Sequence, residues 1–337
     1  MKSIFSRIPK FIIFLLFLFL FIIAIFLSVA LGKTAIPLST VVDAFLNYDE
    51  TVTEHVIIMT SRVSRTVIAI VIGASLAISG ALMQALTRNP LASPDIFGIN
   101  AGALFFIVFA ATFLSVSSLV EYMWIGFLGA AVSGALVYFL GSLGRDGLSP
   151  IRIVLAGAAI TALFVSFTQG ILVLSEQNLQ SVLFWLAGSV AGRSMDMLLP
   201  ILPFMLTAGI VALLMGQATN IMMSGEDVAK SLGQRTILIK VTIGVIVVFL
   251  AGGSVAIGGA IGFIGLIVPH IVKGIIGIDY RWVIPMSAIT GATILLFADV
   301  AARLVIMPQE MPIGVMTAML GTPFFIYIAR KGVGRSE

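Results

Sequence analysis

The sequence predicts an all-α protein that crosses a membrane about ten times. Hydrophobic residues make up 60% of the 337 residues, charged residues only 10%, and the mean hydropathy is +1.17. Soluble domains carry about 45–50% apolar and about 25% charged residues. Since one helix crosses a bilayer with about 20 apolar residues, this content is enough for about ten crossings. These proportions exclude a soluble enzyme and a disordered chain, and the lack of cysteine excludes a disulfide scaffold.

Apolar runs of crossing length follow one another along the chain, separated by short polar loops. The first run lies behind Lys2, Arg7 and Lys10. It is longer than the apolar region of about 7–15 residues in a signal peptide, so we expect a retained helix, with cleavage after Ala30 as a minor alternative. The expected crossings are Phe11–Leu31, Val63–Gln84, Phe97–Ser115, Tyr122–Ser142, Ile151–Leu174, Met195–Met215, Ile237–Gly253, Ile261–Ile278, Val283–Val305 and Val315–Ile328.

The distribution of Lys and Arg predicts the orientation. With the N-terminus inside the cell, fourteen of the nineteen Lys and Arg residues fall on the inner side and five on the outer side, as the positive-inside rule requires. An even number of crossings then places both termini in the cytoplasm. The net charge of +4 is therefore an orientation signal and indicates no nucleic-acid partner. The loops are short, so we expect residues 1–337 to form a single transmembrane domain.

Two loops are long enough to hold structure of their own. The outer loop, Lys33–Ser61, contains an amphipathic stretch, Leu38–Leu46. In the inner loop, residues 216–236, acidic side chains follow Ser224 and Gly225. Acidic side chains stabilise the start of a helix, so a short helix is expected from about Gly225 to Leu232. This helix is either a docking element for a cytoplasmic partner or an ordinary amphipathic connector, and the pattern alone does not decide between them.

Three further features concern the helices themselves. The glycine-rich run Gly252–Gly265 predicts a break, which a membrane protein tolerates only against protein or a water-filled cavity. Asp299 and Arg303 lie four residues apart, share a helix face and are expected to pair within the membrane. Arg303 lies near an outer helix end, as do Arg62 and Arg65. Such arginines suit an acidic protein surface, although anchoring at the membrane interface is the simpler interpretation.

The chemistry that the chain lacks narrows its function. The sequence contains no GxxxxGK[ST] motif for nucleotide phosphates, no HExxH motif and only two histidines, His55 and His270. No cluster of metal ligands is visible, so we expect this chain to bind no cofactor or metal. Asp299 is the only acidic residue expected within the membrane, whereas ion-driven carriers use relay carboxylates or broken-helix ion sites. The pattern indicates a glycine-rich bundle that other proteins drive.

Specific strings of the sequence resemble the FecCD family, the permease subunits of ABC importers for iron–siderophores, haem and cobalamin. They occur in order over nearly the whole chain, with Ser64, Ser93 and Ala260 as mild departures from the family pattern. The strings are Arg62-Val-Ser-Arg65, Gly73–Gln84, Arg88–Pro94, Phe184–Ser189, Gly225–Gly233, Gly262–His270, Ala298–Arg303, Glu310–Val315 and Gly321–Phe325.

The resemblance implies a type II ABC importer permease fold and several partners. These are a second FecCD-type permease in a homodimer or heterodimer, two cytoplasmic ATPase subunits that bind ATP and Mg, and an extracytoplasmic substrate-binding protein. It also implies roles for individual residues. Arg62, Arg65 and Arg303 would dock the binding protein, Asn89, Pro90 and Leu91 would lie at the inner gate, and the ATPase would couple to Gly225, Glu226, Val228, Ala229, Leu232 and Gly233.

From this resemblance we expect import of an iron(III)–siderophore complex by ATP-driven alternating access, in the cytoplasmic membrane of a bacterium. The chain itself would perform no covalent chemistry. Import of cobalamin or haem by the same architecture remains open. An ion-coupled secondary carrier is the less favoured alternative from another class.

Overall fold

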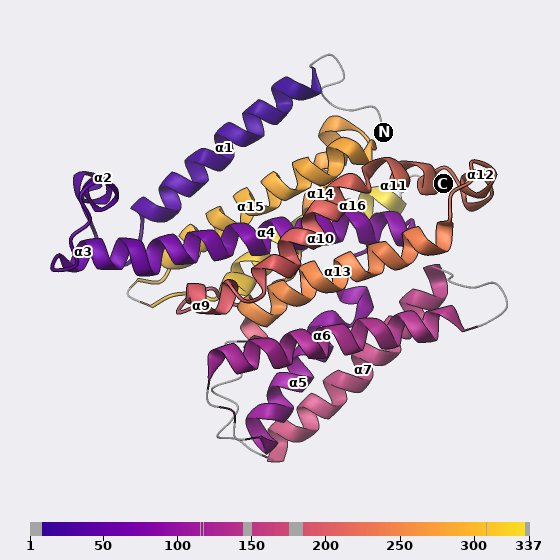
Figure 1. Ribbon diagram of the computed structural model, residues 1–337, viewed down its shortest axis with the longest axis horizontal. Helices are drawn as coiled ribbons and strands as arrows, with labels where there is room; N and C mark the ends of the chain where they lie inside the picture. Colours follow the sequence, from indigo (N-terminus) through magenta and orange to yellow (C-terminus); the bar gives the residue numbers. More distant parts are fainter. Residues whose placement is uncertain are drawn as a thin grey trace.

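The computed structural model describes residues 9–114, 116, 118–143, 150–174, 185–307 and 309–333, and all regular structure in them is helical. The predicted fold class is thus confirmed. Most of the long helices run along one common direction (Figure 1). The elements are α1 (Lys10–Ala30), α2 (Leu38–Leu46), α3 (Thr53–Val56), the π-helix η1 (Ile57–Val63), α4 (Ser64–Thr87), the 3-10 helix η2 (Pro94–Phe97), α5 (Ile99–Phe113), α6 (Leu119–Ser142), α7 (Pro150–Leu174), α9 (Met195–Leu198), α10 (Leu202–Leu214), α11 (Gly216–Met223), α12 (Glu226–Ser231), α13 (Thr236–Gly258), α14 (Ile264–Ile276), α15 (Tyr280–Leu304) and α16 (Ile313–Val333).

Within the described residues, six helices are long and apolar enough to cross a bilayer, and α10 and α11, bent by 54° at their junction, reach that length only as a pair. Three further helices have shorter apolar stretches, Ile99–Phe113 in α5, Ile264–Ile276 in α14 and Ile313–Ile326 in α16. At about 1.5 Å per residue, α14 reaches about 20 Å, less than the hydrocarbon thickness of about 30 Å. The ten expected crossings therefore have ten apolar counterparts, of which α5 and α14 are too short to span a bilayer alone.

Helix α4 lies at the centre of the bundle, packed against α13, α14 and α15. Glycine makes these approaches close enough to exclude a side chain. A Cβ atom at Gly73 would lie 2.5 Å from the carbonyl oxygen of Gly291, and one at Gly80 would lie 1.8 Å from that of Gly265. In lipid, where helices gain little from the hydrophobic effect, such close backbone packing holds them together.

Two helix boundaries differ from those expected. The second crossing begins at Thr53 rather than Val63, because η1 and α3 extend it through residues placed in the outer loop. Helix α13 continues past the expected crossing end at Gly253 to Gly258. Gly252 and Gly253 lie inside the helix, where Cβ atoms would press on Ala130 and Met205 at 2.9 and 2.8 Å. The break lies at residues 259–263, inside the predicted run Gly252–Gly265, so Gly252 and Gly253 themselves serve helix packing.

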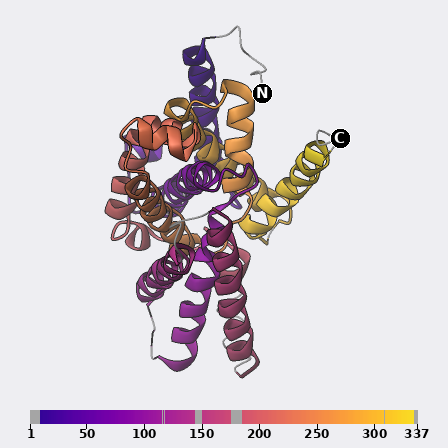
Figure 2. The ribbon, with the colours of Figure 1, turned by 90° about the vertical axis from the view of Figure 1, so that its right-hand side faces the viewer.

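A short helix lies at each of the two ends of the bundle, α2 at one and α12 at the other. The α2 end, on the left of Figure 1, holds α2 and the start of α4, and the α12 end lies opposite. Figure 2, viewed along the bundle, shows α16 projecting from one side and α5 and α7 extending from another. Much of the surface of α7 is exposed, including Leu155, Leu163 and Phe167. The core helices α4, α13 and α15 are far more buried.

Candidate functional site

A cluster of charged side chains lies at the α2 end, where α4 begins and α15 ends. The carboxylate of Asp299 is fully buried and accepts hydrogen bonds from Arg65, at 2.9 Å from Nε and 2.7 Å from Nη2. Arg303, one turn away on α15, also donates to it. A buried carboxylate is costly unless charged partners surround it, and Asp299 has two. The sequence indicated the partner on the same helix but not Arg65, which lies 234 residues away.

Glu310, in the loop before α16, extends the cluster to the surface. Its Oε2 lies 2.7 Å from Nη1 of Arg65, and its Oε1 lies 3.5 Å from Nζ of Lys33. Arg65 therefore bridges the fully buried carboxylate of Asp299 and the slightly exposed one of Glu310. Lys33 is the most exposed member of the cluster, with 49% of its side chain accessible.

Arg62 and Arg303 bind the C-terminal end of α1. Arg62 donates to the carbonyl oxygens of Val29 and Ala30 at 3.0 and 2.6 Å. Arg303 donates to those of Ser28 and Leu31 at 2.8 and 3.0 Å. The last carbonyls of a helix lack partners within the helix and form the negative end of its dipole, so guanidinium groups stabilise them. The two arginines thus fasten α1 to η1 and α15.

This arrangement bears on the expected docking role. Arg62 and Arg303 are only 4% and 2% exposed, because their guanidinium groups turn toward α1. They nevertheless line a cavity of about 260 Å³ together with Lys33, Arg65 and Glu310. Four cationic side chains and one anionic side chain leave this cavity positive, so it suits a carboxylate.

Backbone hydrogen bonds join the break between α13 and α14 to residues 185–189, and join those residues to the start of α16. Ala260 N donates to Trp185 O at 3.0 Å, Ser189 N to Gly258 O at 2.7 Å, and Gly314 N to Gly188 O at 3.0 Å. Non-helical backbone within a membrane requires such partners. Gly259 has φ +73°, and a Cβ atom there would lie 2.4 Å from Trp185 O. Only glycine fits this position.

Phe263, the residue before α14, has φ +68°, a strained conformation for a bulky residue. A Cβ atom at Gly321 of α16 would lie 2.4 Å from its ring. The break therefore contacts α16 directly. Sequence patterns gave no signal for this conformation, because it depends on packing against a helix about sixty residues later.

The turn at Asn89–Leu91 closes the α12 end of α4. Arg88 ends α4 with φ +51°, and the side chain of Asn89 accepts a hydrogen bond from Leu91 N at 2.9 Å. The guanidinium of Arg88 donates to Met222 O at 3.1 Å, near the end of α11. The turn expected at the inner gate is thus tied to the helix that leads into α12.

Helix α12 occupies most of the range expected for the short inner helix. Glu226 at its start lies 3.0 Å from Nζ of Lys240 and 3.2 Å from that of Lys230. The hydrogen bond from Lys240 is the main cause of a lowered pKa of Glu226. Ala229 is buried, whereas Val228 and Leu232 expose apolar side chains. Gly225 and Gly233 flank the helix with φ +123° and +78°, conformations that favour glycine.

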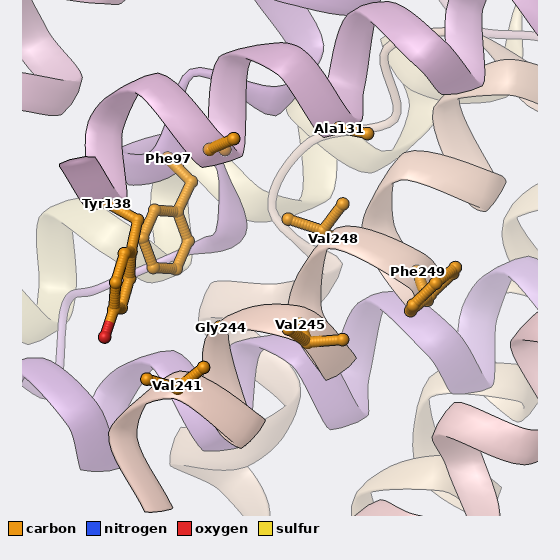
Figure 3. A pocket seen from close by; sticks show the side chains of 10 residues that line it. Phe97, Ala131, Tyr138, Val241, Gly244, Val245, Val248 and Phe249 are labelled. Carbon is orange, nitrogen blue, oxygen red and sulfur yellow. The ribbon is translucent and has the colours of Figure 1, made fainter. Parts of the chain in front are cut away.

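A cavity of about 460 Å³ lies between α6 and α13 (Figure 3). Phe97 and Tyr138 lie side by side at one end and Phe249 lies at the other. Tyr138 is the only polar side chain in the lining of this cavity. The cavity therefore offers no charged group to orient a ferric complex. Among the described residues, no group of three or more His, Cys, Asp or Glu side chains could hold a metal ion.

The model of the FecCD transport family matches residues 20–331. The chain belongs to the FecCD transport family. It is 52% identical over 323 residues to YfiZ of Bacillus subtilis (strain 168), named as a probable siderophore transport system permease protein, and this match covers 96% of the chain and 97% of YfiZ. It is 42% identical to YfmD of the same organism, an Fe(3+)-citrate import system permease protein, over 97% and 96% of the two chains.

A solved structure supports the same assignment for this FecCD chain. The fold is similar to that of an ABC transporter assigned to the metal-chelate type, solved in an inward-facing conformation, with a TM-score of 0.83 and 28% identity. The match covers 95% of this chain and 99% of that one. The resemblance seen in the sequence strings is thereby confirmed, and the chain is a polytopic membrane permease.

Proposed function

We propose that this chain is the permease subunit of a binding-protein-dependent ABC importer that carries an iron(III)–siderophore complex into the cell. The observation that carries the proposal is the 52% identity, over nearly the whole length, to a protein named as a siderophore permease. Residues 1–337 form a single transmembrane domain in this proposal. ATP and Mg bind to partner ATPase subunits, and the chain contributes the wall of the pathway.

The exposed helices support a second permease subunit. The outer face of α7 carries a stripe of small and polar exposed residues at helical spacing, Ala159, Ala162, Ser166 and Gln169. Such residues favour close helix contact in a membrane and can also face a polar pathway. In the proposed dimer, of two copies or of two related chains, this face of α7 lines the route for the substrate.

The α12 end supports coupling to an ATPase. Helix α12 exposes Val228 and Leu232 at the end of the bundle, and α11 connects it to Arg88 and the Asn89–Leu91 turn. A push on α12 is transmitted by α11 and Arg88 to the turn, which opens or closes the inner gate in an alternating-access cycle. In this orientation the α12 end and both termini are cytoplasmic, as the positive-inside rule favours.

The α2 end then faces the substrate-binding protein. A carboxylate of that protein enters the positive cavity beside Lys33 and Arg65. Because Arg62 and Arg303 are occupied with α1, they contribute chiefly charge to this cavity. Direct contact with the binding protein is then made by the more exposed side chains of Lys33 and Arg65.

Uptake by cells that lack this chain tests the substrate. Loss of radiolabelled iron(III)–siderophore uptake, with cobalamin and haem uptake intact, is the expected result. Loss of cobalamin or haem uptake instead would assign one of those substrates.

Reconstitution tests the energy source. With the ATPase and the binding protein in the same vesicles, substrate import is expected to require ATP. Import by the permease alone, driven by an ion gradient, would show a secondary carrier and contradict the proposal.

A further inference from the structure

Helix α2 lies across the direction of the bundle. Figure 1 shows it nearly end-on at the α2 end, whereas α4 and α15 run along the length of the view. Its nine residues, Leu38–Leu46, are followed by a connection to α3 that contains a turn at Glu50 and Thr51. A helix in this position lies roughly parallel to the plane of the membrane that the long helices cross.

One face of α2 packs on the protein. Val41 and Ala44 are buried in a small apolar cluster with Val29 of α1 and Ile58 of η1. Residues three apart lie on the same side of a helix. This contact fixes both the position of α2 and its rotation about its own axis.

The rest of the helix is divided between apolar and polar side chains. Ser39, Asp43 and Asn47 recur every four residues, are exposed, and form a polar face. A second exposed stripe is wholly apolar and lies between the polar face and the buried one. It consists of Leu38, Val42, Phe45 and Leu46, which are 50%, 49%, 54% and 75% exposed.

The level of α2 along the bundle explains this second stripe. Its buried face contacts Val29, in the last turn of α1. Helix α1 has 21 residues and therefore a length of about 31 Å, close to the hydrocarbon thickness of about 30 Å. Its last turn thus marks the boundary between lipid tails and headgroups. A helix at that level has protein on one side, lipid on another and water on the third.

We propose that α2 is an interfacial helix whose stripe of Leu38, Val42, Phe45 and Leu46 inserts into the lipid leaflet at the α2 end. Helices of this kind bury an apolar face about 5–10 Å into the boundary between headgroups and acyl chains. No Lys or Arg occurs in α2, so insertion depends on apolar burial and not on anionic headgroups. Because α2 packs on the end of α1 that Arg62 and Arg303 hold, the bilayer contributes to fixing that end.

The chain contains no cysteine, so spin labels at single introduced cysteines test the proposal directly. Val42→Cys and Phe45→Cys report on the apolar stripe, and the matched controls are Ser39→Cys on the same helix and Asn47→Cys at its C-cap. The labelled full-length chains, assembled with their transporter, are placed in phosphatidylcholine nanodiscs. Collision rates with oxygen, which partitions into lipid, and with a water-soluble nickel chelate are then measured.

The expected ratio of oxygen to nickel collision rates is several-fold higher at the two stripe positions than at the two controls. The ratios are expected to stay the same when phosphatidylglycerol replaces part of the phosphatidylcholine. Equal ratios at all four positions would overturn the proposal. So would stripe labels that are shielded from nickel only after binding protein is added, because that result assigns the stripe to a protein interface.

Discussion

Arg303 and Ser28, 275 residues apart in the chain, meet where the end of α15 lies against the end of α1. Arg303 Nη1 donates a 2.8 Å hydrogen bond to the carbonyl oxygen of Ser28. The same guanidinium also donates to the buried carboxylate of Asp299. One side chain therefore links the membrane carboxylate to the C-terminal cap of the first helix, and its loss would disturb both.

Replacing Asp299 by Asn is expected to lower stability without changing substrate choice. The substitution leaves Arg65 and Arg303 buried without their shared counter-charge, and breaking a buried ion pair costs about 3–5 kcal/mol. Thermal unfolding in detergent measures the loss, and competition between siderophores in uptake measures the preference. Arg281→Gln, whose side chain is 66% exposed, is the control and should leave thermal unfolding nearly unchanged. An altered preference with unchanged unfolding would contradict this role.

Reversing the charge of Lys33 tests docking without disturbing the cap of α1. Lys33→Glu is expected to raise, several-fold, the binding-protein concentration that half-stimulates ATP hydrolysis, because a rim charge governs encounter with an acidic surface. Lys33→Gln should have a smaller effect. The transporter should assemble normally in both cases, since Lys33 is half exposed. Unchanged stimulation by Lys33→Glu would remove this side chain from the docking surface.

Charged residues on the exposed face of α12 are expected to uncouple the ATPase. Val228→Asp with Leu232→Asp places two carboxylates at an apolar contact, where unpaired charges are strongly unfavourable. Co-purification of the ATPase with the permease should fall, and transport should be lost. Asp196→Asn, on α9 at the opposite end, serves as the control. Normal co-purification together with normal transport would refute the coupling role.

Two glycine substitutions should have opposite outcomes because their surroundings differ. Gly80→Ala is expected to destabilise the chain by about 1–3 kcal/mol, the usual cost of overpacking. The reason is that its Cβ atom would lie 1.8 Å from the backbone of Gly265. Gly209→Ala on α10 meets nothing within 4 Å and is expected to be neutral or stabilising. Thermal unfolding of both variants measures the difference. Equal stability would mean that α4 and α14 can separate without cost.

The sequence by itself determined the class of protein, most of its crossings and its family. Apolar runs are local properties of the chain, and a bilayer requires each crossing to be apolar along its own length. The amphipathic segment Leu38–Leu46 and the short helix after Gly225 were predicted for the same reason, because each pattern is formed by residues that are close together in the sequence. The family strings likewise needed no three-dimensional information.

Only the tertiary structure decided what these residues touch. Arg65 and Arg303 share the carboxylate of Asp299, and Arg62 and Arg303 cap α1. Phe263 contacts α16. Each of these contacts joins segments that lie far apart in the sequence. Helix ends and breaks leave backbone groups that must find partners elsewhere in the protein, because lipid offers none. Those partners depend on which helices become neighbours, and no local pattern records that.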